Sequence, residues 1–148
     1  ILATAERFGL GAVQLHGHET PAQCEELSEA GLLVLKAFSV GQAVDFAALL
    51  PYVPHCDFFL FDTKGAAPGG NGAIFDWQLL SGYHLPVPYF LAGGLGLEHA
   101  AELAALRLPG LVGVDLNSAF ETAPGVKDAA RVGQMLAALT LRLMKNEE

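Results

Sequence analysis

Short groups of polar residues and glycines follow the apolar runs of this sequence, and several of these residue types can do chemistry. The groups are Gln14, His16 and Gly17; Lys36; Asp62, Thr63 and Lys64; Ala92, Gly93 and Gly94; and Asp115, Asn117 and Ser118. A carboxyl group at the end of a strand, beneath a loop that excludes water, can act as a general acid. Asp62 is the candidate for this role, and an Asp that merely starts a turn is the open alternative.

Two turns with small residues indicate an anion site. Ala-Gly-Gly-Leu starts directly after Leu91, Asp-Leu-Asn-Ser starts directly after Val114, and a helical pattern follows each of them. Glycine lets the backbone approach a ligand, and successive N–H groups at the start of a helix attract phosphate. The turns therefore predict a phosphorylated small-molecule ligand, with a plain tight turn at Gly93 and Gly94 as the alternative.

Three further patterns carry weaker signals. His16 and His18 lack a third ligand at a recognisable spacing, so no metal site is predicted. The glycine-rich residues 69–72 are a candidate lid over the site or a simple connection. Cys24 and Cys56 lack C-x-x-C spacing and are predicted to be buried free thiols.

The apolar runs that precede the polar groups are predicted strands. They are apolar almost throughout, which is typical of strands covered on both faces of a parallel sheet. The runs cover residues 12–16, 32–36, 58–61, 87–91 and 111–114. Helical patterns lie at 21–30 and 42–50, where the second stops against Pro51. A last helix carries an apolar stripe of Val132, Met135, Leu136, Leu139 and Leu143. Alternating strands and helices predict an α/β fold with right-handed crossovers.

The repeat length suggests a larger barrel. Five strand-helix units at about 30 residues each extrapolate to roughly 240 residues for eight units, the usual size of a (β/α)8 TIM barrel. The first eight residues have helical spacing but neither an initiator Met nor an N-cap. We therefore expect residues 1–148 to form a single domain that is the C-terminal part of a (β/α)8 barrel, about strands 4 to 8, present as a partial barrel.

Composition narrows the possible partners. The formal net charge is −8 and the eight Lys and Arg residues are scattered, which argues against a nucleic-acid partner. No apolar run approaches the roughly 18 residues of a membrane span, and no signal peptide opens the chain. A cytoplasmic protein that binds a small molecule is expected, and the sequence leaves its oligomeric state open.

Taken together, the motifs resemble the phosphoribosylanthranilate isomerase family, particularly its Bacteroidota members. The matching strings are AVQLHG at residues 12–17, FLFDTK at 59–64, GGNGAIFDW at 69–77, LAGGL at 91–95 and GVDLNSAFETAPGVKD at 113–128. They run through nearly the whole chain in the family's order. The FDTK string followed by GGNG and FDW is specific, whereas AGGL is shared by many phosphate-binding barrels.

The resemblance implies an aldose-ketose isomerase of tryptophan biosynthesis that needs no cofactor. Its reaction is the Amadori rearrangement of N-(5'-phosphoribosyl)anthranilate to 1-(2-carboxyphenylamino)-1-deoxyribulose 5-phosphate. Asp62 would be the general acid that opens the ribose ring. The implied substrate-binding residues are Gln14 and His16 on the pocket wall, Asp115 at the ribose hydroxyls, and Gly93, Gly94, Asn117 and Ser118 at the phosphate.

The sequence departs from the family at two places. The family commonly has Ser-Ser-Gly where this chain has Asn117, Ser118 and Ala119. Hydrogen-bond donors therefore remain, but the ready access of Gly to the left-handed backbone conformation is lost. The family's general base, a Cys in a Lys-x-Cys-Gly context, and its carboxylate-binding Arg come from early strands that the sequence lacks. Cys24 lies in a predicted helix and cannot replace that base, so the 148-residue chain alone is expected to be inactive.

Two alternatives to the isomerase remain open. One is a non-catalytic partial barrel that binds phosphate or a partner. The other is a different phosphate-binding barrel enzyme such as indole-glycerol-phosphate synthase. That enzyme needs catalytic lysines and a glutamate near strand ends, a pattern that Lys36 and Lys64 fit poorly.

Overall fold

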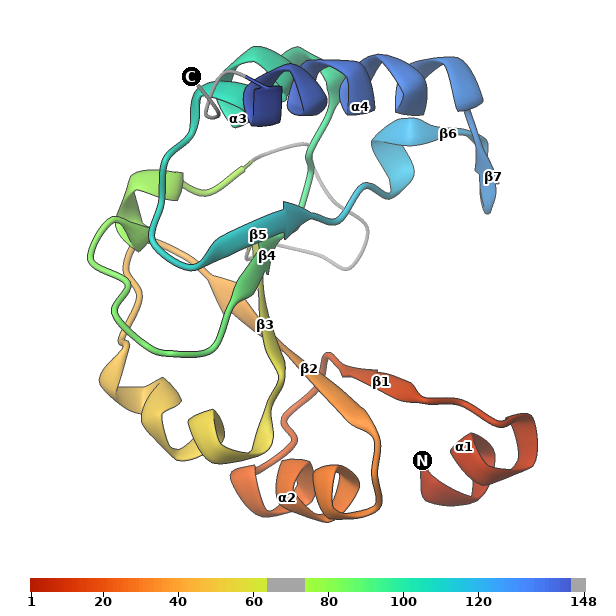
Figure 1. The fold of residues 1–148 in the computed structure, drawn as a ribbon, viewed down its shortest axis with the longest axis vertical. Coiled ribbons are helices and arrows are strands. Elements are labelled where there is room, and N and C mark those ends of the chain that lie inside the picture. The colour runs from red at the N-terminus through yellow and green to blue at the C-terminus, as the bar shows by residue number, and fades with distance from the viewer. Residues whose placement is uncertain (64–73, 145–148) are drawn as a thin grey trace.

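The fold is built around a curved, five-stranded parallel sheet (Figure 1). The computed structural model of the protein describes residues 1–63 and 74–144. The strands, in their order across the sheet, are β1 (Ala12–Leu15), β2 (Leu33–Val40), β3 (Phe58–Thr63), β4 (Tyr89–Leu91) and β5 (Leu111–Val114). Every adjacent pair is parallel. The predicted α/β class is confirmed, and each of the five predicted runs contains a strand, although β2 continues to Val40 and β4 begins only at Tyr89.

Helices surround the outer side of the sheet and make the molecule C-shaped in Figure 1. The helices are α1 (Leu2–Phe8), α2 (Pro21–Glu29), α3 (Ala100–Ala105) and α4 (Ala129–Met144), and the 3-10 helices are η1 (Ala47–His55), η2 (Trp77–Leu80), η3 (Leu97–His99) and η4 (Ser118–Phe120). A hairpin of β6 (Glu121–Ala123) and β7 (Val126–Lys127) leads into α4. None of the helices in the described ranges is long and apolar enough to cross a membrane.

Helix α2 forms where the sequence predicts it, because its first turn carries the right signals. The Thr20 hydroxyl accepts a hydrogen bond from the Gln23 N–H, and the Gln23 side chain accepts one from the Thr20 N–H, which completes a capping box. Pro21 occupies the first turn, where its missing N–H costs nothing. Cys24 and Leu27 then face the core, which fixes the helix against the sheet.

The predicted helix over residues 42–50 is wrong in both type and position. The structure has the 3-10 helix η1, which begins at Ala47 and continues through Pro51 and Pro54. A proline has no N–H to donate and its ring clashes with the preceding turn of an α-helix, so tighter turns replace the α-helix here. The Asp45 carboxylate caps the start by accepting from the N–H groups of Ala47 and Ala48.

The predicted apolar stripe of α4 is confirmed for three of its members. Met135 is fully buried, and Val132 and Leu139 are half-buried against the core. Leu136, however, is 55% exposed and lies outside the stripe. The side chain of Leu143 lies outside the described residues. A narrower stripe suffices because α4 covers the outside of the molecule and packs chiefly against α3.

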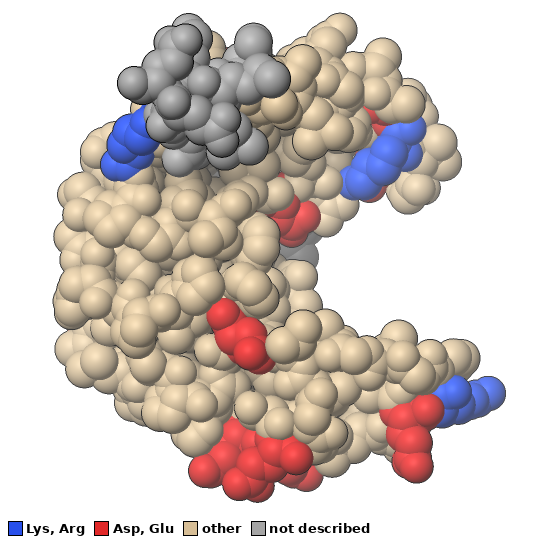
Figure 2. Space-filling view, viewed as in Figure 1, with Lys and Arg blue, Asp and Glu red and all other residues tan. Residues whose placement is uncertain are grey.

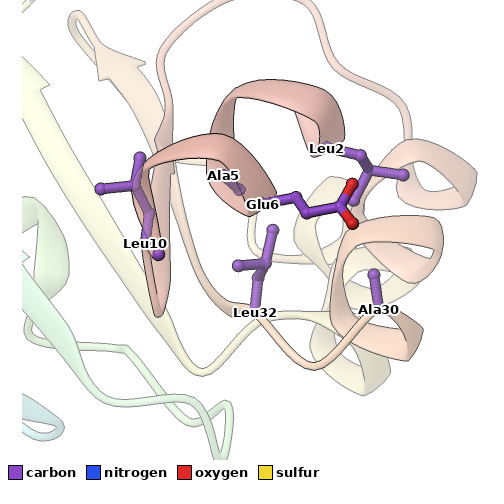
Figure 3. A pocket seen from close by; sticks show the side chains of 7 residues that line it. Leu2, Ala5, Glu6, Leu10, Ala30 and Leu32 are labelled. Carbon is purple, nitrogen blue, oxygen red and sulfur yellow. The ribbon is translucent and has the colours of Figure 1, made fainter.

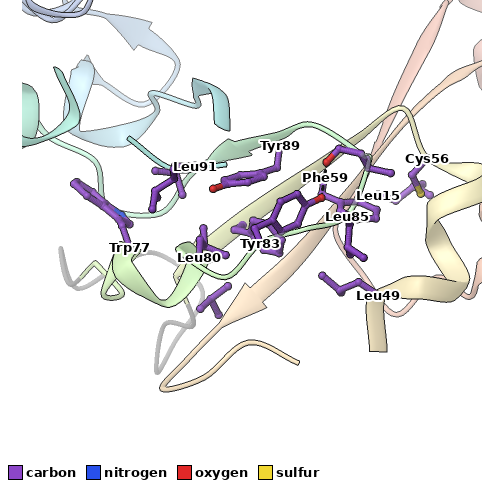
Figure 4. Packing of buried hydrophobic residues seen from close by; sticks show 14 of the residues in the cluster. Leu15, Leu49, Cys56, Phe59, Trp77, Leu80, Tyr83, Leu85, Tyr89 and Leu91 are labelled. Carbon is purple, nitrogen blue, oxygen red and sulfur yellow. Dashed lines mark hydrogen bonds between the residues drawn. The ribbon is translucent and has the colours of Figure 1, made fainter. Parts of the chain in front are cut away.

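Apolar side chains pack on both faces of the sheet, which explains the almost uninterrupted hydrophobicity of its strands. On the outer face, strand residues such as Phe59, Tyr89 and Leu91 pack in one buried cluster with Leu80 of η2 and with Tyr83, which follows η2 (Figure 4). Burying each such side chain contributes roughly 1.5–3 kcal/mol. On the inner face a smaller buried cluster consists of Ala37, Leu60 and Ala92, with Leu35 and Phe90 packed against it.

The two cysteines are buried free thiols, as the sequence predicts. Burial raises the pKa of Cys24, and burial followed by the charge of neighbouring Cys24 raises the pKa of Cys56 from 9.0 to about 12. An unfolded chain therefore releases these protons at lower pH than the folded chain does. Stability from this source is complete below pH 9.0 and is lost as the pH rises towards about 12.

We therefore expect the urea midpoint of unfolding to fall between about pH 8 and about pH 10, and to fall less in Cys56→Ala than in the unsubstituted chain. The two proteins are compared by how steeply the urea midpoint falls with pH. The cavity left by the substitution lowers the midpoint equally at every pH and does not change this slope. Identical slopes for the two proteins would contradict the prediction.

Candidate functional site

The carboxyl ends of the parallel strands meet at one edge of the sheet and bring several predicted site residues to the same level. Phe61, Leu91 and Val114 are paired across β3, β4 and β5. Asp62 and Asp115 each follow one of these residues, and the Asp115 N–H donates to the Leu91 carbonyl at 2.8 Å. Figure 2 shows that the molecule is hollowed on one side, with acidic side chains bordering the hollow.

His16 and Asp62 are in direct contact. Nε2 of His16, directly after β1, lies 3.1 Å from Oδ2 of Asp62 near the end of β3. Strand β2 runs between them, and at the level of His16 it carries the small side chain of Ala37, which leaves room for the contact. The Asp62 side chain is 23% exposed and His16 is 48% exposed, so a ligand can reach both. The sequence placed both residues in one site but did not predict their pairing.

The turn after β4 lies against Asp62. Gly93 and Gly94 both have positive φ, 84° and 68°, in the region that only glycine adopts readily. A Cβ on Gly93 would collide with Oδ1 of Asp62 and with the Thr63 backbone N–H. The Thr63 hydroxyl donates to the Gly93 carbonyl at 3.3 Å and accepts from the Phe75 N–H at 3.2 Å. The predicted anion turn and the predicted acid are therefore adjacent.

The second predicted anion turn, after β5, is held by a lysine that the sequence did not single out. Nζ of Lys127 donates to Oδ1 of Asn117 at 2.9 Å, to the Leu116 carbonyl at 3.2 Å and to Oε1 of Glu121 at 2.9 Å. Hydrogen bonding by Lys127, and then by the Gly125 N–H, lowers the pKa of Glu121. Ser118 is exposed beside this network. The signal available in the sequence was a lysine six residues after a glutamate, bracketing a short turn.

Gln14 lies deeper in the sheet than the other predicted residues. The strand register aligns it with Leu35 and with Phe58, four residues before Asp62. It is exposed on β1, at the edge of the described sheet. Lys64 and the candidate lid at residues 69–72 lie outside the described residues.

Lys36 was expected at the end of a strand, and that expectation is wrong. Strand β2 continues past it to Val40, and the Lys36 side chain is only 3% exposed. It forms an ion pair with Glu19, with Nζ and Oε2 3.2 Å apart. A lysine within an apolar run, together with an acid just after the preceding strand, was the signal for this buried pair.

One pocket lies away from these residues. Its volume is about 580 Å³, and it opens between α1 and the turn after α2 (Figure 3). The lining is Leu2, Ala5, Glu6, Gly9, Leu10, Ala30 and Leu32. Apart from Glu6 these side chains are apolar or absent, and none of these residues lies at the carboxyl end of a strand. The pocket therefore offers few groups that could bind or protonate a polar substrate, and the candidate site remains at the carboxyl ends of the strands. In the ranges 1–63 and 74–144, no three His, Cys, Asp or Glu side chains are grouped as metal ligands.

Comparison with known proteins gives a consistent result. The family model described as N-(5'phosphoribosyl)anthranilate (PRA) isomerase matches residues 1–138. The N-(5'-phosphoribosyl)anthranilate isomerase of Phocaeicola vulgatus is 46% identical over 132 residues, 89% of this chain and 64% of that protein. The Parabacteroides distasonis isomerase is 40% identical over 128 residues, 86% of this chain and 58% of that protein.

A solved structure agrees with these relatives. The phosphoribosyl anthranilate isomerase of Thermus thermophilus superposes with a TM-score of 0.68 at 31% identity, covering 98% of this chain and 66% of that one. The chain thus spans somewhat less than two thirds of the length of these relatives. Because the family model covers residues 1–138 and the Phocaeicola vulgatus isomerase is 46% identical over 89% of the chain, the chain belongs to the N-(5'-phosphoribosyl)anthranilate isomerase family.

Proposed function

We propose that the complete protein is a cytoplasmic phosphoribosylanthranilate isomerase of tryptophan biosynthesis, and that residues 1–148 are one domain, about strands 4 to 8 of a (β/α)8 barrel. The family membership and the longer relatives support this proposal. So does the curved parallel sheet, in which β1 and β5 are the edges among the described strands. A closed barrel needs further strands between those two edges.

The observation that carries the proposal is the contact between His16 and Asp62 beside the Gly93 turn. In the proposed reaction the Asp62 carboxyl group protonates the ribose ring oxygen, and the C1–O bond breaks to give a Schiff base. A base then removes the proton from C2, and the resulting enolamine tautomerises to the ketone. No electron or group leaves the substrate, so the chemistry needs no cofactor. The His16 N–H donates to the carboxylate that remains on Asp62 and stabilises its charge.

The turns after β4 and β5 are the proposed phosphate site. Backbone N–H groups at Gly93 and Gly94 and the donors of Asn117 and Ser118 would bind the phosphate oxygens. The helices that follow are short, so the turns themselves supply the donors. Asp115, level with Asp62 and one strand beyond Gly93, would accept hydrogen bonds from the ribose hydroxyls. Gln14 would line the deeper wall.

The test is to give the complete protein N-(5'-phosphoribosyl)anthranilate and to follow the product by chromatography. Conversion to the carboxyphenylamino-deoxyribulose phosphate supports the proposal. Consumption of that second compound with release of carbon dioxide would instead identify an indole-glycerol-phosphate synthase. Phosphate binding without turnover of either compound would favour the non-catalytic alternative.

Replacing Lys127 by Met is expected to weaken the binding of inorganic phosphate by about three- to tenfold, because the freed Asn117 no longer holds its amide in one orientation. The dissociation constant is measured by calorimetry on the complete protein. Arg131→Met is the matched control, since it removes a positive charge close by without touching Asn117. An equal loss in both variants would show that only net charge matters and would contradict the role of Lys127.

A further inference from the structure

The Lys36 ammonium group is buried among backbone carbonyls rather than facing the hollow. Besides its ion pair with Glu19, Nζ donates to the carbonyls of Gly17 at 3.1 Å and Ala37 at 2.9 Å, and the Leu15 carbonyl lies at 3.5 Å. A cation this deeply buried is costly unless it is fully paired. Two of its partners, Gly17 and Glu19, lie in the turn between β1 and α2, so the buried ammonium group fixes the conformation of that turn.

Glu19 completes the same network from the other side. Its carboxylate accepts from the Gly17 N–H at 2.9 Å and 3.2 Å, and it pairs with Lys36. Burial acts to raise the pKa of Glu19, but the hydrogen bonds from its own backbone, from Lys36 and from Gly17 outweigh burial and lower it. Glu19 is therefore held as the carboxylate, and both polar groups of the Gly17 backbone are engaged.

The turn held in this way carries His16. The Lys36 ammonium contacts the carbonyls of Leu15 and Gly17, the residues directly before and after His16. The imidazole is nearly half exposed, so packing restrains it little, and its direction depends on the backbone below it. A small rotation of these peptide groups would move Nε2 out of its 3.1 Å contact with Asp62.

We propose that Lys36 is a positioning residue: it holds the backbone on both sides of His16 so that the imidazole faces Asp62. Its catalytic consequence rests on the proposed isomerase function, whereas its effect on the geometry of His16 and Asp62 does not. Lys36 touches no substrate in this arrangement and acts only through the turn. The competing interpretation is that the buried pair of Lys36 and Glu19 merely stabilises the fold.

The two interpretations are separated by measuring the effect of Lys36→Met with and without His16. In the complete protein, Lys36→Met is expected to lower kcat by about tenfold or more while KM changes little, because the histidine is misplaced and the phosphate turns are not. In a His16→Ala background the same substitution is expected to cause no further loss. Arg107→Met is the matched control, because Arg107 also donates to two backbone carbonyls, those of Ala104 and Leu106, away from the site. This control should keep wild-type kcat in the otherwise unsubstituted protein.

Equal losses of kcat in the two backgrounds, or no loss in the wild-type background, would overturn the proposal. A measurement that needs no substrate tests the positioning of His16 independently of the proposed function. Long-range ¹H–¹⁵N spectra of the wild type should show an Nε2 signal of His16 that is displaced from that of a free imidazole by its hydrogen bond with Asp62. In Lys36→Met the Nε2 signal should move towards that of a free imidazole, and an unchanged signal would also overturn the proposal. Should that variant not fold, Glu19→Gln, which weakens the same turn, is measured by the same criteria.

Discussion

Replacing Asp62 by Asn is expected to lower kcat by about 10²- to 10⁴-fold while the affinity for the substrate stays close to that of the wild type. The amide has nearly the same shape as the carboxyl group and can still hydrogen-bond to His16, so the pocket is preserved. It cannot deliver a proton to the ribose oxygen. The measurement is steady-state kinetics of the complete protein, combined with a direct titration of substrate binding.

The same substitution at the other end of β3 is the matched control. Asp57 precedes the strand, and its Oδ2 accepts from the Val34 N–H at 2.8 Å. Asn keeps an oxygen in that position, so Asp57→Asn should retain wild-type kcat. If Asp62→Asn retained full turnover, the role of general acid would belong to another group, and the proposed mechanism would be wrong.

Gly93→Ala is expected to destabilise the protein by about 2–4 kcal/mol and to lower kcat/KM by at least about tenfold. Two effects add. The backbone of Gly93 has φ 84°, which costs an alanine about 1–2 kcal/mol. In addition, the new methyl group would collide with Asp62 and with Thr63, so the carboxyl group must shift away from His16. The free energy of unfolding is measured by urea denaturation.

Gly125→Ala separates the two effects. Gly125 has a similar φ of 78°, but nothing lies within 4 Å of the Cβ that would be added. This variant should therefore lose only the backbone contribution of about 1–2 kcal/mol. The excess loss in Gly93→Ala measures the collision with Asp62 and Thr63. Equal losses in the two variants would show that the turn after β4 can relax away from the acid.

Local composition was sufficient to locate the strands and the first turn of α2. Runs such as 58–61 are apolar because both of their faces are covered, and this property is visible without knowing the partners. Thr20, Pro21 and Gln23 act within one turn of helix, so their effect is equally local. The order of strand ends in the chain then placed Asp62, Gly93 and Asp115 at one edge of the sheet, because all the strands are parallel.

The misread elements depend on contacts that periodicity does not contain. The spacing in residues 42–50 resembles a helix, but η1 instead follows the cap at Asp45 and the two prolines within it. The β6 and β7 hairpin was missed because its strands have only three and two residues. Leu136 has helical spacing and yet faces solvent, since the width of the buried stripe depends on what packs against α4.

The sequence by itself determined the fold class, the family resemblance and the residue types at the strand ends, because these follow from local pattern and from motif order. Tertiary structure alone decided which of those residues meet. His16 reaches Asp62 across β2 because Ala37 is small. The Lys36 side chain points to the segment between β1 and α2 because Glu19 and the Gly17 carbonyl bind its ammonium group there. Such contacts join residues separated by 17 or more positions, and the curvature and register of the sheet bring them together.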